Sequence, residues 1–140
     1  MAALTLAVER LAAATVLSCH GALVAASALQ LETALSQALL RPELRIVVDL
    51  EAVAAIDCTG VVMLRVTAGI AAEQGGSLVL AAPNAQVVHT LREGGTLTTI
   101  PTYRTVPAAL DGDANALITE PDAAPSPNAW PMNRADRRSA

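Results

Sequence analysis

The chain has 140 residues, of which 53% are hydrophobic, and it contains one Trp, one Tyr and no Phe. This length predicts one domain with a real core built from Leu, Val, Ile and Ala. The net charge is -4 and all nine basic residues are Arg, with no basic cluster, which excludes nucleic acid as the main partner. Two cysteines, Cys19 and Cys58, are too few for a secreted disulfide framework, so we expect a reducing, cytoplasmic environment.

Residues 11–31 carry no formal charge, which raises the question of a membrane segment or a signal peptide. The stretch is too polar for a good spanning helix. The "VLSC" sequence that ends at Cys19 is similar to a lipoprotein cleavage box, but Glu9 and Arg10 precede it and a basic start is missing. We therefore expect a soluble protein without a membrane segment.

The first elements in chain order are two strands, 4–11 and 14–21, separated by a turn near Arg10. Ser27 and Gln30 then have the spacing of a capping box. Apolar residues at helical spacing follow up to Leu39, and Arg41-Pro42 ends this helix.

The sequence "LRIVVDL", residues 44–50, is typical of a central strand covered on both faces. Residues 51–56 form a short connection to Asp57, where a second helix begins and runs to Gly75-Gly76. A strand at 77–82, a short helix from Pro83-Asn84 to Gly94-Gly95, a last strand at 97–103 and a final helix at 105–112 complete the pattern. Strands that alternate with helices predict an α/β fold with a parallel or mixed sheet.

The character of the chain changes at Asp113, and the domain is expected to span residues 1–112. Residues 113–140 contain four prolines in an Ala-rich, polar stretch, which predicts a disordered tail. Trp130 is the only large apolar residue of the tail. It either packs loosely or anchors the tail to a partner.

The sequence offers little catalytic chemistry. No glycine-rich phosphate loop follows a strand, and His20 and His89 stand alone without metal-ligand spacing, so we expect no cofactor and no metal. His20 is placed at a strand end and His89 on the polar side of a short helix. Asp49 is expected to end the central strand and to bond the next turn. An enzyme is therefore not predicted.

The stretch Asp57-Cys58-Thr59-Gly60 is the exception. Asp57 suits the N-cap of the second helix, and Gly60 permits close approach to the backbone. A phosphate on Thr59 would meet free N–H groups and the positive end of the helix dipole. The stretch is either an ordinary helix start or a regulatory hydroxyl held at a helix end.

The segments "VVDLEAVAAIDCTGVVML" and "GGSLVLAAPNAQVVHTLREGGTLTTIPTYRTVPAAL" resemble the STAS domain of bacterial anti-sigma factor antagonists, over residues 4–112. The resemblance implies a mixed β-sheet with helices packed mainly on one face. It also implies binding to an anti-sigma factor of the serine/threonine kinase type, which frees a sigma factor. The kinase would phosphorylate the hydroxyl before the motif glycine, here Thr59, and so dissociate the complex. The implied docking surface comprises Asp57, Cys58, Thr59, Gly60 and the turn after the second strand with Gly21, Ala22 and Val24.

Two positions depart from the family pattern. Cys58 replaces a Ser, and Gly21-Ala22-Leu23-Val24 replaces Gly-Glu-Leu-Asp, whose acids lie near the phosphosite and help kinase recognition. A divergent antagonist that is not phosphorylated, or that serves another partner, therefore stays open. So does redox control through Cys58 and Cys19, because a thiol in the first turn of a helix can have a lowered pKa.

Two rival functions also follow. The first is a STAS accessory subunit of a lipid-transport ABC complex, in which the same helix docks on an ATPase. The second is a thiol enzyme that uses Cys58. The oligomeric state, monomer or homodimer, is not predicted.

Overall fold

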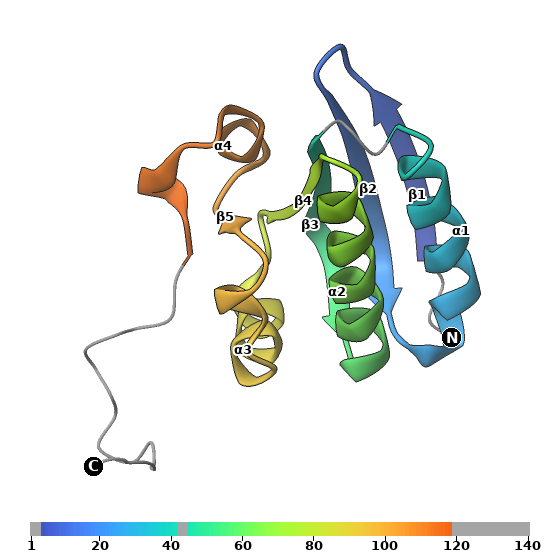
Figure 1. The fold of residues 1–140 in the computed structure, drawn as a ribbon. Helices are drawn as coiled ribbons and strands as arrows, with labels where there is room; N and C mark the ends of the chain where they lie inside the picture. Colours follow the sequence, from blue (N-terminus) through green and yellow to red (C-terminus); the bar gives the residue numbers. More distant parts are fainter. Residues whose placement is uncertain (1–3, 42–44, 119–140) are drawn as a thin grey trace.

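The computed structural model describes residues 4–41 and 45–118. Five strands form one sheet in the order in which they occur along the chain (Figure 1). Strand β1 is antiparallel to β2, whereas β3, β4 and β5 continue the sheet in parallel. The sheet is therefore mixed, as predicted. The strands are β1 Leu4–Arg10, β2 Ala14–Leu23, β3 Arg45–Ile56, β4 Ser77–Ala81 and β5 Thr102–Tyr103.

Three helices, α1 Ala28–Ala38, α2 Cys58–Glu73 and α3 Ala85–Glu93, bury their apolar sides in one cluster, and α4 Val106–Asp111 packs in another (Figure 1). Side chains alternate between the faces of a strand. In β3, accordingly, Val48 belongs to the cluster under α1, α2 and α3, and Val47 to the cluster under α4. Helices thus lie mainly on one face of the sheet, which confirms the predicted fold class.

Strand β3 is longer than predicted, because the expected connection at 51–56 is its second half. Strand β2 also continues past the predicted end, and Leu23 pairs with Ile56. Val53 and Ile56 of this extension are buried in the cluster under α1, α2 and α3. Small, exposed residues between them hide the strand pattern in the sequence, so the prediction of a connection was wrong.

The predicted last strand at 97–103 was also wrong for most of its length. Residues Thr96–Thr98 form a 3-10 helix, η2, and β5 has only two residues. Gly95 turns the chain with φ 72°, and Pro101 has no N–H to donate to a sheet. The chain joins the sheet only from Pro101 onwards: the Pro101 carbonyl accepts from Leu80 N–H and the Tyr103 carbonyl from Ala82 N–H, both at 2.9 Å.

The capping box predicted at Ser27 does not form. A 3-10 helix, η1 Ala25–Ser27, precedes α1, and the Ser27 hydroxyl donates to the Ala22 carbonyl at 2.6 Å instead of capping α1. The Gln30 side chain donates to the Leu4 carbonyl at 3.2 Å. Both side chains therefore fasten α1 to the neighbouring strands.

The described structure continues past residue 112, where the domain was predicted to end. A 3-10 helix, η3 Ala114–Ala116, follows α4, and Leu117 bridges to Tyr103. Ile118 N–H then donates to the Thr102 carbonyl at 2.7 Å. The first residues of the predicted tail thus bond to β5, while the rest of it, with Trp130, lies outside the described residues.

Candidate functional site

Asp57 forms the N-cap of α2, as predicted. Its backbone is extended, with φ -115° and ψ -174°, and its Oδ1 accepts from the N–H groups of Thr59 at 2.9 Å and Gly60 at 3.2 Å. An acidic side chain at this position satisfies N–H groups that a helix start leaves without a carbonyl. The start of α2 is therefore fixed by one side chain.

Asp57 also joins α2 to the end of β2. Asp57 N–H donates to the Leu23 carbonyl at 3.2 Å, and Asp57 Oδ2 accepts from Ala25 N–H at 3.2 Å. The end of β2, η1 and the first turn of α2 thus meet at one corner of the molecule. We call residues 21–26 and 57–60 the β2–α2 corner.

Gly60 allows this close approach. A Cβ atom at Gly60 would clash with the Leu23 carbonyl oxygen, and it would lie 3.0 Å from Ile56 Cγ1 and from Leu23 Cβ. The glycine of the motif thus has a packing role, because a side chain there would push α2 away from the sheet.

The structure brings the residues of the expected docking surface together, with one correction. Gly21 and Ala22 lie inside β2, not in a turn after it, and the chain leaves the strand only at Val24. Cys58 is exposed, Thr59 and Val24 are half-buried, and Ala22 is buried. Asp57 is the one charged side chain of the β2–α2 corner.

Three of the N–H groups at the start of α2, which were expected to meet a phosphate on Thr59, already have acceptors. Those of Thr59 and Gly60 donate to the Asp57 carboxylate, and that of Val61 donates to the Asp57 carbonyl at 3.0 Å. A phosphate would therefore add a charge of roughly -1.5 to -2 beside an existing carboxylate. Its main effect would be on the charge of the surface.

The two cysteines are not brought together. Cys58 is exposed at the start of α2, whereas Cys19 is buried in β2. Asp57, the residue before Cys58, is bonded to Leu23. Cys19 lies four residues before Leu23, or about 13 Å along the strand, whereas a disulfide needs Cα atoms within about 7 Å. Burial, reinforced by the negative charge of Asp49, raises the pKa of Cys19 to about 12, so this thiol stays protonated at neutral pH. In this fold, Cys19 is not a partner for Cys58.

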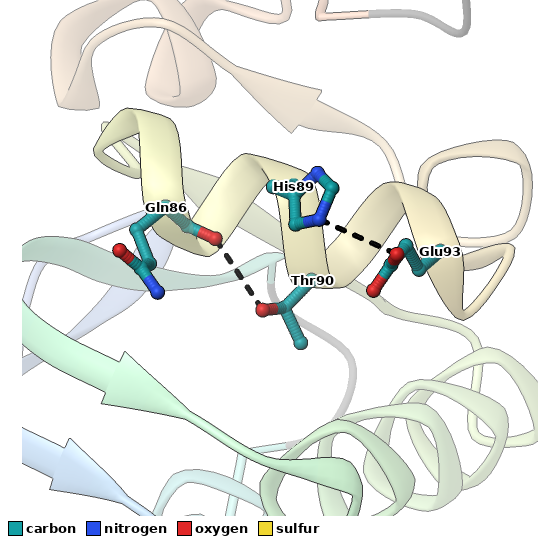
Figure 2. A network of polar contacts seen from close by, with 4 residues as sticks. All are labelled: Gln86, His89, Thr90 and Glu93. Carbon is teal, nitrogen blue, oxygen red and sulfur yellow. Dashed lines mark hydrogen bonds and ion pairs between the residues drawn. The ribbon is translucent and has the colours of Figure 1, made fainter.

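In the described structure, neither histidine lies in a cluster of side chains that could form a catalytic or metal-binding site. His20 is exposed on β2. His89 lies on the outer side of α3, 3.3 Å from the Glu93 carboxylate, while the Thr90 hydroxyl donates to the Gln86 carbonyl one turn earlier (Figure 2). Within residues 4–41 and 45–118, no group of three or more His, Cys, Asp or Glu side chains could hold a metal ion.

Asp49 lies within β3 and not at its end, and its carboxylate accepts from Glu51 N–H at 3.0 Å. The predicted bond to the following backbone is therefore present, although the predicted strand end is not. Across the described part of the chain, no helix combines the length and the apolar character that crossing a membrane requires.

The prediction missed an apolar stripe on the exposed side of α2. Val62, Val66 and Ile70 follow Cys58 at intervals of four residues and are 53%, 57% and 37% exposed. Residues four apart lie on one face of a helix. The signal was present in the sequence, because apolar residues occur on the exposed side of α2 as well as on its buried side, which is unusual for a helix with a solvent-exposed face.

The model of the STAS domain family matches residues 5–109, so the chain belongs to this family. A search among curated proteins gave no match. An anti-sigma factor antagonist from Mycobacterium paratuberculosis is 25% identical, with a TM-score of 0.71 over 79% of this chain and 93% of that chain.

Two more distant structures share the fold. The unphosphorylated anti-sigma factor antagonist SpoIIAA of Bacillus is 19% identical, with a TM-score of 0.61 over 77% of this chain and 95% of that chain. The murine anion transporter Slc26a9 is 16% identical, with a TM-score of 0.56 over 64% of this chain and 15% of that chain. At these identities the similarity establishes the fold alone.

Proposed function

We propose that this protein is an anti-sigma factor antagonist. It binds an anti-sigma factor of the serine/threonine kinase type through the β2–α2 corner, frees a sigma factor and catalyses no reaction itself. Membership of the STAS family and the likeness to the mycobacterial antagonist support this proposal. Antagonists with this role act in the bacterial cytoplasm, where we place the protein.

The observation that carries the proposal is the arrangement around Asp57. One carboxylate holds the end of β2 and the start of α2 together, and it leaves Cys58 and Thr59 at the surface between them. Ala25 and Ala26 are exposed beside them. A small, nearly uncharged surface on rigid elements is suited to bind a protein, because little ordering entropy is lost when it docks.

Thr59 is the proposed switch. A phosphate there would place a second negative group beside Asp57, on a surface that is otherwise uncharged, and would oppose docking of an apolar partner surface. Ala22 and Val24 supply no acid for kinase recognition, so a kinase that modifies Thr59 must recognise other features. In this protein, recognition then depends on the shape of the β2–α2 corner.

The test compares wild type, Thr59→Ala and Thr59→Glu as baits in the native cell, with Thr98→Glu as a control on the exposed part of η2. We expect wild type, Thr59→Ala and the control to capture a kinase-type anti-sigma factor that Thr59→Glu loses. Equal capture by all four baits would mean that Thr59 is not a switch. Capture of a transport ATPase in place of an anti-sigma factor would refute the antagonist function.

A further inference from the structure

The exposed stripe of α2 borders a groove between α1 and α2. The groove has a volume of about 240 Å³. It is mostly apolar, and among the described residues that line it Glu32 has the one charged side chain. The apolar lining residues are Leu35, Leu39, Val62, Met63, Val66 and Ile70.

This surface is costly to leave in water. Val62, Val66 and Ile70 would each contribute to the apolar area removed from solvent by an occupant, at about 25 cal/mol per Å². Leu40, two residues after α1, is 73% exposed and lines an adjoining hollow that shares Glu32 and Ser36 with the groove. Contiguous exposed apolar patches mark binding sites.

We infer that the occupant is the segment of this chain around Trp130. Trp130 is the only tryptophan, and it is the kind of large side chain that anchors in apolar grooves. Residues 123–133 around it carry no charge, which matches the apolar wall of the groove. An indole ring is amphipathic, so Glu32 at the rim does not exclude it.

The chain is long enough for this contact. The described part ends at Ile118, which is bonded to Thr102 at the β5 edge of the sheet. Trp130 follows Ile118 by twelve residues, which span up to about 40 Å when extended. Five strands about 4.8 Å apart and one helix layer about 10 Å thick require roughly 30 Å, so Trp130 can reach the groove.

The charges are complementary. Residues 1–118 contain ten acidic and six basic side chains, whereas residues 133–140 contain three Arg and one Asp. Glu32 lines the groove, and Glu73 lies exposed at the end of α2 beyond Ile70. A segment that placed Trp130 in the groove would bring a basic stretch near these carboxylates.

This contact would cover Val62, which lies one helical turn after Cys58. A partner that docks on the β2–α2 corner and along α2 would have to displace the Trp130 segment. That consequence for partner binding rests on the proposed function, whereas the contact itself does not.

The test uses the fluorescence of Trp130 in the full-length chain, since no other tryptophan contributes. We expect the wild-type emission to lie at shorter wavelength than that of N-acetyl-tryptophanamide, with acrylamide quenching reduced severalfold. Val66→Asp should return both values to those of the free compound. Gln86→Glu adds the same charge on an exposed position of α3 and should leave both values unchanged.

Val66 is more than half exposed, so Val66→Asp should keep the fold, which far-UV circular dichroism checks. A double variant, Val62→Ser with Ile70→Ser, tests the same groove without adding charge and should also expose Trp130. Wild-type emission equal to that of the free compound would overturn the inference, as would shielding that survives both groove variants. Shielding that increases with protein concentration would assign the groove to a second copy and overturn it too. None of these results depends on capture of an anti-sigma factor, so the two proposals can fail separately.

Discussion

Substitution of Gly60 by Ala tests how closely α2 must approach the sheet. The added Cβ would collide with the Leu23 carbonyl oxygen and crowd Ile56 Cγ1 at 3.0 Å. A backbone carbonyl cannot rotate away as a side chain can, so α2 or the end of β2 must move. Such a movement would strain the bonds from Asp57 that join the two elements.

The magnitude follows from two opposing effects. Overpacking of a closely packed contact costs about 1–3 kcal/mol. Ala is favoured over Gly in a helix by up to about 1 kcal/mol, an advantage that is smaller in the first turn. We therefore expect Gly60→Ala to lower the free energy of unfolding by about 1–2 kcal/mol.

Gly69 offers a matched control in the same helix. A Cβ at Gly69 would meet no atom within 4 Å, so Gly69→Ala should raise the free energy of unfolding by up to about 1 kcal/mol. Urea titration followed by circular dichroism measures both variants, and the thermal midpoint should shift by about 4 °C per kcal/mol. If Gly60→Ala proved as stable as Gly69→Ala, the packing role assigned to Gly60 would be refuted.

Four further predictions concern single side chains. Asp57→Ala should lower the free energy of unfolding by about 1–2 kcal/mol in urea titrations, whereas Asp57→Asn, which can still cap α2, should lose much less; equal losses would contradict the capping role. Burial raises the pKa of Cys19 from 9.0 to about 12, so above pH 9 the folded chain keeps a proton that the unfolded chain loses. The difference in free energy of unfolding between wild type and Cys19→Ala should therefore be constant below pH 9. Above pH 9 the wild type should lose at most about 1.4 kcal/mol per pH unit relative to the variant. A thiol reagent at pH 8 should modify only Cys58 in the folded protein, and two labels per chain by mass spectrometry would argue against the burial of Cys19. Glu93→Gln should change stability by less than about 0.5 kcal/mol, since its pair with His89 is exposed, and a larger loss would show a role that the geometry does not indicate.

Features governed by neighbouring residues were predictable from the sequence. Asp57 caps α2 as predicted, and Asn84, which was expected to open a short helix, caps α3 by accepting from Val87 N–H at 2.9 Å. The order of the elements predicted a parallel or mixed sheet, and the family resemblance implied a mixed one. The two caps depend on contacts a few residues apart, which the sequence pattern records directly.

Features governed by distant pairing were not predictable. The second half of β3 is a strand because β2 continues beside it, and Ala52, Ala54 and Ala55 reveal nothing of that partner. The continuation of the described structure to Ile118 depends on its bond to Thr102, sixteen residues earlier. Likewise, the hydrogen bond from Ala25 N–H to the Asp57 carboxylate joins positions 32 residues apart. Only the family resemblance could lead us to expect these two segments to be neighbours.

The residues of the β2–α2 corner come from one stretch, 21–60, that leaves β2, crosses over through α1 and returns along β3. The corner therefore takes no side chain from the β1–β2 turn or from anything after α2. A circularly permuted chain, opened at residues 11–13 and rejoined through a linker, would keep the corner uninterrupted. The same separation leaves the second half of the domain free to diverge in sequence while the corner is retained.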